Sequence, residues 1–205
     1  SADSGAVEVM DPVKSRYDGI GGPASGLGMP VAPARSVAGG TVQAFQAGAI
    51  AVAADGRATE VRGGIWTAYN DLGGPASPLG WPTVPQRSGA VAGSLVQDFA
   101  GGSMYYSAAT GAHDIRGAIR LAYLFVGGEK SALGLPTSGE VAGPVPGSRM
   151  NTFAGGAIYW SPATGPQVVT GPIAVAYAKG MAASLGLPTA GAKAGRVGGV
   201  VTQDF

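Results

Sequence analysis

The sequence predicts a single α+β domain, residues 1–205, made of four tandem repeats of about 54 residues that close into a propeller-like ring. Three markers predict the repeats: a Leu-Gly-x-Pro motif, a tyrosine before it and a phenylalanine after it. Successive copies of each marker are 52 or 54 residues apart. Because the markers share one period, coincidence does not explain them. They are Leu27, Leu79, Leu133 and Leu185 for the motif, Tyr17, Tyr69, Tyr123 and Tyr177, and Phe45, Phe99, Phe153 and Phe205.

Each repeat is predicted to begin with a short helix. An apolar residue lies four positions before every marker tyrosine, and this spacing places both side chains on one helix face. A glycine break and the Leu-Gly-x-Pro turn follow, because glycine ends helices and allows tight turns. The four apolar pairs are Val13/Tyr17, Ile65/Tyr69, Ile119/Tyr123 and Ile173/Tyr177.

The second half of each repeat is predicted to be a three-stranded meander. A loop of about ten residues precedes a first strand that ends in the marker phenylalanine, such as Leu95–Phe99. Second and third strands follow across glycine-containing turns, at Ala157–Trp160 and Gln167–Thr170 in the third repeat. A glycine then starts the next helix.

The two ends of the chain predict ring closure. The last repeat stops at Phe205, after its first strand, whereas the segment Gly5–Asp11 aligns with the third strand Gly111–Gly117. We expect this N-terminal strand to complete the last repeat, so that the termini are adjacent and no sheet edge stays free. An open solenoid and a shortened chain are the alternatives. The predicted repeats are 11–63, 64–117, 118–171, and 172–205 completed by 1–10.

Composition excludes several classes of function. Thirteen basic and twelve acidic residues give a net charge of +1, which provides no basic field for nucleic acid. The chain has no cysteine and one histidine, so we expect no disulfide, thiol nucleophile, metal or other cofactor. No apolar run approaches 18 residues, so we expect no membrane insertion.

Positions filled alike in every repeat are interpreted as architectural. The Leu-Gly-x-Pro motif lacks the Gly-Lys-Ser/Thr ending of a phosphate-binding loop, and its leucine is predicted to fill the core. An amide also recurs two residues before each marker phenylalanine, on the same strand face. Since a buried amide must be hydrogen-bonded, we expect it to bond neighbouring backbone; a ligand-facing amide is the alternative. The amides are Gln43, Gln97, Asn151 and Gln203.

Positions that vary between repeats are the candidate ligand-binding positions. Aromatic rings stack against sugars, and the second strands carry Tyr105-Tyr106 and Tyr159-Trp160. Neighbouring strand residues point to opposite faces, so one of each pair is predicted to be core and the other exposed. Further candidates are Trp66, Trp81, Asp98 and Asp204.

The single histidine, His113, is followed by Asp114. Both are candidate ligand contacts, but they point to opposite faces and so cannot form a His–Asp pair; a structural or surface role is favoured for His113. No Gly-x-Ser-x-Gly motif is present, so no catalytic residue is predicted. A glycosidase-type carboxylate pair, Asp98 with Asp114 or Glu140, stays open because such pairs are defined only in space.

Several recurring motifs together resemble the LGFP-repeat family. They are the four Leu-Gly-x-Pro copies, the stretch Phe153–Gly165 and the Gly-x-Ile-x-x-x-Tyr helix. The resemblance implies an exported actinobacterial protein, located in the cell envelope, whose repeats attach it to the wall through polysaccharide. It also implies that an enzyme such as a mycoloyltransferase or a peptidoglycan amidase can be appended.

The sequence therefore predicts a non-catalytic, monomeric module that binds arabinogalactan or peptidoglycan. Shallow, weak sites in the second and third repeats, which alone keep the aromatic pairs, would act together. The alternatives are a small secreted hydrolase with carboxylates at a central channel, and a scaffold for protein partners.

Overall fold

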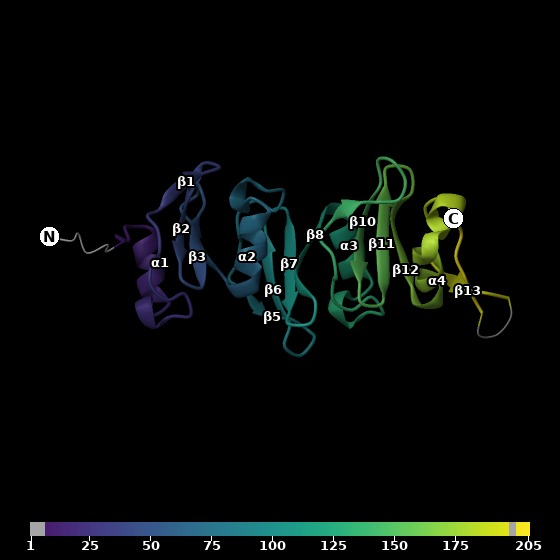
Figure 1. The fold of residues 1–205 in the computed structure, drawn as a ribbon, viewed down its shortest axis with the longest axis horizontal. Coiled ribbons are helices and arrows are strands. Elements are labelled where there is room, and N and C mark those ends of the chain that lie inside the picture. Colours follow the sequence, from purple (N-terminus) through teal and green to yellow (C-terminus); the bar gives the residue numbers. More distant parts are fainter. Residues whose placement is uncertain (1–6, 197–199) are drawn as a thin grey trace. The chain divides into compact units, whose positions relative to one another are not determined.

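The computed structural model describes residues 7–196 and 200–205 (Figure 1). The chain divides into two compact units, each described by itself below. The first comprises residues 1–87 with 95–106, and the second comprises residues 88–94 with 107–205.

The first unit begins with one complete helix-and-sheet repeat. Helix α1 (Val13–Gly19) and the short turn η1 (Gly22–Ala24) precede a four-stranded antiparallel sheet of strand order β1-β2-β3-β4. Helix α2 (Gly63–Asp71) and η2 (Gly74–Ala76) then begin the next repeat. The strands of the first sheet are β1 (Arg35–Val37), β2 (Gly40–Phe45), β3 (Gly48–Val52) and β4 (Ala58–Arg62).

The second and third repeats have the same order of elements. The second sheet comprises β5 (Arg87–Ser88), β6 (Leu95–Phe99), β7 (Gly102–Ser107) and β8 (Gly111–Arg116). Helix α3 (Gly117–Phe125) and η3 (Gly128–Lys130) follow. The third sheet comprises β9 (Val141–Ala142), β10 (Arg149–Phe153), β11 (Gly156–Ser161) and β12 (Gly165–Thr170).

The described part of the fourth repeat is smaller. Helix α4 (Gly171–Ala176) continues into η4 (Tyr177–Met181), where Gly180 has a left-handed φ of 106° that kinks the chain before α5 (Ala182–Leu185). Two short strands, β13 (Lys193–Ala194) and β14 (Val201–Thr202), pair antiparallel.

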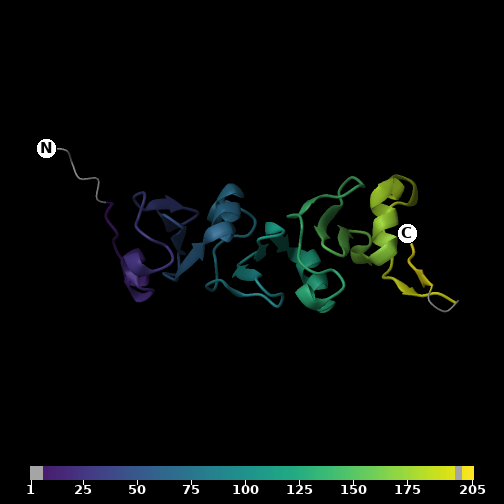
Figure 2. The ribbon, with the colours of Figure 1, turned by 60° about the horizontal axis from the view of Figure 1, so that its bottom comes forward.

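The first sheet is covered by a helix on each face (Figures 1 and 2). On one face, Val13 and Tyr17 of α1 pack against Ile50 and Val52 of β3. The opposite face carries Val42, Ala49 and Ala51, and these pack against Trp66 of α2 and Trp81. Both faces of the sheet are therefore core.

The predicted helix face is confirmed in the first three repeats, whereas in the fourth Ile173 is half-buried and Tyr177 lies in η4. Val13 and Tyr17, Ile65 and Tyr69, and Ile119 and Tyr123 are buried pairs. Helices α2, α3 and α4 each begin at a glycine with a left-handed φ of 49° to 61°, a conformation that other residues adopt only with strain. These glycines are Gly63, Gly117 and Gly171.

Two features of the predicted repeat need correction. Each complete sheet has four strands, because the loop before the predicted first strand contributes a further strand of two or three residues that is too short to show an alternating pattern. The motif leucines 27, 79 and 133 are buried as predicted, whereas Leu185 is 42% exposed. Leu27 packs against Ile50 and Val52, while the described fourth repeat offers only β13 and β14.

Ring closure is not shown. Residues 1–6 of the predicted closing strand lie outside the described part of the chain, and residues 7–10 form no strand. The Glu8 carbonyl oxygen accepts a hydrogen bond from Gln43 Nε2 at 2.8 Å, so this segment bonds to the first repeat. The Glu8 carbonyl oxygen is thus the acceptor for Gln43 that the Glu60 carbonyl oxygen is for Gln97.

Candidate functional site

The Leu-Gly-x-Pro motif is tied to the helix before it in every repeat. The hydroxyl of each marker tyrosine donates to the carbonyl oxygen of the motif glycine, at 2.6 Å from Tyr69 to Gly80 and 2.8 Å from Tyr123 to Gly134. Tyr17 and Tyr177 bond Gly28 and Gly186 in the same way. Each tyrosine ring also lies 4.6–4.9 Å from the ring of the marker phenylalanine. These contacts give the Leu-Gly-x-Pro motif a structural role.

The recurring amides bond backbone, as predicted. Gln97 Nε2 donates to the carbonyl oxygens of Glu60 at 2.9 Å and Val84 at 3.0 Å. The first acceptor lies in the strand before the repeat and the second lies just after the Leu-Gly-x-Pro motif. The other three amides bond equivalent carbonyl pairs: Gln43 to Glu8 and Ala32, Asn151 to Asp114 and Ser138, and Gln203 to Val168 and Ala190.

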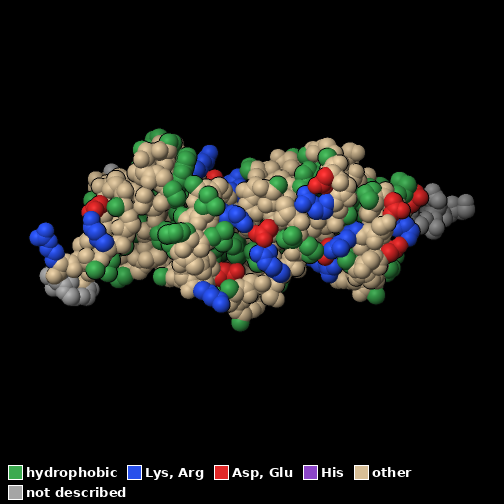
Figure 3. All heavy atoms as spheres, turned by 180° about the vertical axis from the view of Figure 1, so that it is seen from behind, with side chains coloured by type: hydrophobic (Ala, Val, Ile, Leu, Met, Phe, Trp, Pro, Cys, Tyr) green, Lys and Arg blue, Asp and Glu red, His purple; other side chains and the backbone are tan. Residues whose placement is uncertain are grey.

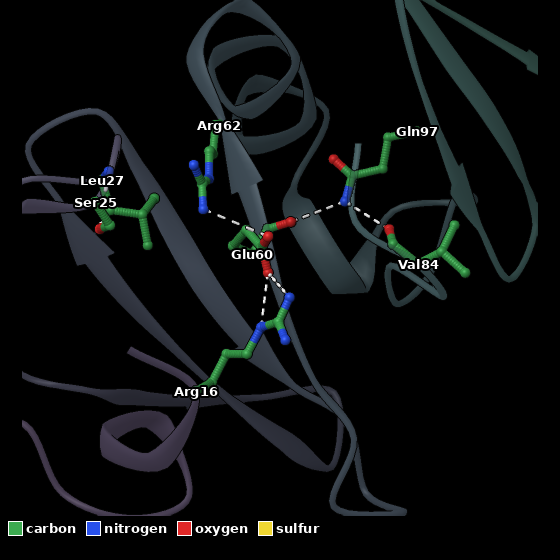
Figure 4. A network of polar contacts seen from close by, with 7 residues as sticks. All are labelled: Arg16, Ser25, Leu27, Glu60, Arg62, Val84 and Gln97. Atoms are coloured by element: carbon green, nitrogen blue, oxygen red, sulfur yellow. Dashed lines mark hydrogen bonds and ion pairs between the residues drawn. The ribbon is translucent and has the colours of Figure 1, made fainter. Parts of the chain in front are cut away.

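Glu60 is the centre of a polar network in the first unit (Figure 4). Its buried carboxylate accepts from Arg16 Nε at 2.8 Å and Nη2 at 2.5 Å, and lies 3.5 Å from Arg62 Nη2. With the Gln97 bond to its backbone oxygen, Glu60 joins helix α1, strand β4 and strand β6. A buried carboxylate needs such partners, because an unpaired charge would be costly.

The predicted aromatic candidates differ in exposure. Tyr105 and Tyr159 are each 6% exposed, while Tyr106 and Trp160 are half-buried. The Tyr106 ring lies against the backbone of Gly64, at the start of α2. Sequence patterning could not choose between the faces, because strand residues on both faces pack in the core.

Trp66 and Trp81 are half-buried and pack on the face of the first sheet that carries Val42, Ala49 and Ala51. A Cβ atom on Gly40 would lie 2.7 Å from the Trp81 ring, so this glycine admits the indole. The two tryptophans therefore have a packing role, and ligand binding by them remains a prediction.

The polar candidates have protein partners. Asp98 pairs with Arg87 at 2.8 Å, and Asp204 pairs with Lys193 at 2.7 Å, eleven residues upstream in both repeats. Buried Asp114 lies 2.7 Å from Arg116 Nε, and Glu140 lies 3.5 Å from Nη2 of the same arginine.

His113 Nε2 lies 2.7 Å from the carbonyl oxygen of Thr110. Gln167, at the equivalent position of the third repeat, donates to Thr164 O at 2.8 Å. A glutamine thus replaces the histidine with the same contact, which supports the structural role favoured from the sequence. Among the residues that the structure describes, no group of three or more His, Cys, Asp or Glu side chains could hold a metal ion.

The second unit contains a groove that the sequence did not reveal. About 450 Å³ in volume, it lies beside the end of helix α3 and strand β12. Phe125 lines it and is 91% exposed. The Thr170 hydroxyl and the Gln167 side-chain oxygen have no partner among the described residues, and both residues line the groove beside Pro166.

One sequence signal could have identified Phe125. The equivalent positions in the other repeats hold Gly19, Asp71 and Lys179, so an aromatic residue there departs from the repeat pattern at a solvent-facing helix position. An exposed ring beside neutral hydrogen-bonding groups is suited to a sugar, whose C–H face stacks on the ring while its hydroxyls bond the polar groups.

The comparison with protein families agrees with this repeat architecture. The LGFP repeat model matches residues 27–77, 79–131 and 133–183, each match starting at a motif leucine. The chain therefore belongs to the LGFP-repeat family, whose members are commonly associated with the cell wall and are typically non-catalytic. No curated protein matches the chain.

Within the described chain, no helix has the length and apolar character needed to cross a bilayer. On the face drawn in Figure 3, basic and acidic side chains lie next to one another among the coloured residues.

Proposed function

We propose that this chain is a non-catalytic module that attaches a secreted protein to the actinobacterial cell envelope by binding a neutral polysaccharide. The observation that carries the proposal is the groove of Phe125, Thr170 and Gln167 in a chain of LGFP repeats. The groove-lining residues carry no charge, which favours an uncharged sugar chain over an anionic polymer. We propose arabinogalactan or peptidoglycan as the ligand and the monomer as the binding species.

A single sugar stacked on one ring binds weakly. The half-buried rings of Tyr106 and Trp160, in the second and third repeats, are further proposed contacts. Weak sites on one chain raise the overall affinity when a polymer engages several of them together, because later contacts form at high effective concentration.

The test is a pull-down with insoluble actinobacterial cell wall, competed with soluble arabinan, galactan and peptidoglycan fragments. We expect binding that one fragment abolishes. Phe125→Ala should weaken it about threefold to tenfold, if a sugar stacked on the ring gains about as much as an aromatic pair, which is about 0.5–1.5 kcal/mol beyond the buried area. Leu121→Ala is the matched control, because Leu121 is exposed on the same helix but does not line the groove.

No retention at several hundred micromolar protein would refute wall binding. Equal retention of the Phe125→Ala and Leu121→Ala variants would refute the groove as the site.

A further inference from the structure

A second and larger cavity lies between the third sheet and helix α4, inside the second unit. Its volume is about 810 Å³, within the range of small-molecule sites. Phe153 and Tyr159 of the sheet and Ala174 and Tyr177 of the helical segment line it. None of its lining side chains is charged.

The equivalent space in the first unit is filled by tryptophan. There the outer face of the sheet carries Val42, Ala49 and Ala51, and the rings of Trp66 and Trp81 pack on it. The space between the first sheet and helix α2, which we call the first junction, thus contains two indole rings.

The repeat alignment shows why the later junction is open. Ala174 takes the place of Trp66, three residues before the marker tyrosine, and Leu187 takes the place of Trp81. Tyr159, at the position of Ala51, refills only part of the volume, and Ala174 lines the remaining cavity. The cavity is therefore the place where the first junction holds an indole.

One polar group in the cavity wall has no partner. Tyr159 is 6% exposed, and its hydroxyl makes no hydrogen bond with the described residues, whereas the Tyr177 hydroxyl donates to Gly186. A tyrosine hydroxyl is protonated at neutral pH and can donate, and burial raises the pKa of Tyr159 further, to about 12. The hydroxyl oxygen itself is not fully buried, so water reaches it in the cavity, and a ligand oxygen would replace that water as its hydrogen-bond acceptor.

We propose that this cavity binds an uncharged, ring-shaped apolar compound about the size of an indole, with an oxygen that accepts a hydrogen bond from Tyr159. The ring packs between Ala174 of the helix and the side chains of Met150 and Tyr159 on the sheet. A charged compound is disfavoured, because the wall has no charged group to replace its hydration. This site is separate from the polysaccharide groove.

The probe is acetyl-dimethylaminonaphthalene (acdan), a neutral fluorescent bicyclic ring with one carbonyl group. We expect saturable binding with a blue-shifted emission, displaced by indole and not by anionic naphthalenesulfonate. Ala174→Trp should reduce affinity at least tenfold, because the new indole fills the cavity from within as Trp66 fills the first junction. Tyr159→Phe should reduce it about threefold to tenfold, the effect of one hydrogen bond of about 1 kcal/mol.

Ala176→Trp is the matched control, since Ala176 is exposed on the same helix and does not line the cavity; it should leave acdan binding unchanged. Ala178→Phe, a second substitution in the wall, replaces Ala174→Trp if that variant loses its native melting transition. Absence of acdan binding up to about millimolar concentration overturns the proposal. Acdan binding that survives both Ala174→Trp and Ala178→Phe also overturns it. The proposal is likewise overturned if naphthalenesulfonate binds as tightly as acdan, or if an aliphatic ester displaces acdan and indole does not. The folded Ala174→Trp variant should be retained on insoluble cell wall as well as the parent chain is, because the cavity is separate from the polysaccharide groove.

Discussion

The Gln97 side chain donates from Nε2 to the carbonyl oxygen of Glu60, 2.9 Å away, and so fastens strand β6 to the last strand of the repeat before it. The same bond recurs in every repeat, with the N-terminal segment at Glu8 as the first acceptor. Because β4 is an edge strand of its sheet, the amide satisfies a backbone group that no further strand covers.

Gln97→Met should lower the free energy of unfolding by about 1–3 kcal/mol, since it removes the buried hydrogen bond to Glu60 and the part-buried one to Val84, and leaves both carbonyl oxygens without this donor. Chemical denaturation measures the loss. Gln203→Met is the graded control: it removes the same pair of bonds at a half-buried site, where water can replace the amide. A loss as large for Gln203 as for Gln97 would contradict burial as the cause.

Tyr69→Phe should lower the free energy of unfolding by about 1–2 kcal/mol, because it removes the bond to Gly80 at 2.6 Å while the ring packing stays. Tyr106→Phe should change stability little, since the Tyr106 hydroxyl has no partner among the described residues. Thermal melts of both variants check this. Equal losses would show that the contact with the motif glycine is not the stabilising element.

The repeat markers could be predicted from the sequence because they serve contacts within the repeat that are the same in every copy. The Tyr69 ring packs on Phe99 and its hydroxyl bonds Gly80, so all three positions share one period. The strands ending in phenylalanine were predictable for the same reason. Short strands such as β5 were not, because two residues carry no periodic signal.

The candidate site was harder to predict because patterning could not choose the exposed face of a strand. Tyr159 and Trp160 both pack partly in the core, since a helix covers each face of their sheet. The groove at Phe125 and the cavity at Ala174 arise from departures from the repeat pattern. Positions that differ between repeats therefore indicated where candidate binding sites lie, and those on the helices did so better than those on the strands.

Trp66→Ala should destabilise the chain by about 3–5 kcal/mol, the usual cost of removing a packed tryptophan, because the indole fills the space above Ala49 and Ala51. Calorimetry measures the stability. Lys14→Ala, at the equivalent but exposed position of the first helix, should be nearly neutral. A folded, fully stable Trp66→Ala variant that no longer binds cell wall would instead assign Trp66 to ligand binding.

Stability should fall as the pH rises from about 10 to 12. Burial raises the pKa of Tyr159 to about 12, and also raises the pKa values of Tyr69 and Tyr177. In this window the unfolded chain loses tyrosine protons that the folded chain keeps, so ionisation favours unfolding; two pKa units for Tyr159 amount to roughly 3 kcal/mol. Melting temperature against pH measures this, and the Tyr159→Phe variant should show a shallower decline. Identical declines would contradict the shifted Tyr159 pKa.

Glu129 should stabilise the backbone conformation of residues 89–94 in the second unit. Its Oε2 atom accepts hydrogen bonds from the backbone N–H groups of Ala90 at 2.9 Å and Val91 at 3.1 Å, and from the Ser94 hydroxyl at 2.7 Å. Other repeats have proline or alanine at its position, so this contact belongs to the third repeat alone.

Glu129→Ala should therefore raise hydrogen exchange at the Ala90 and Val91 amides by about tenfold or more, because charge-assisted bonds of this kind contribute about 1.5–3 kcal/mol. Exchange in strand β6 should change far less, since its ladder with β7 stays intact. Lys130→Ala is the control at the neighbouring exposed position. Unchanged exchange at Ala90 in the Glu129→Ala variant would show that the segment is ordered by its own turn, in which the Ser94 backbone N–H donates to the Val91 carbonyl oxygen at 3.0 Å, and that the carboxylate contributes nothing to it.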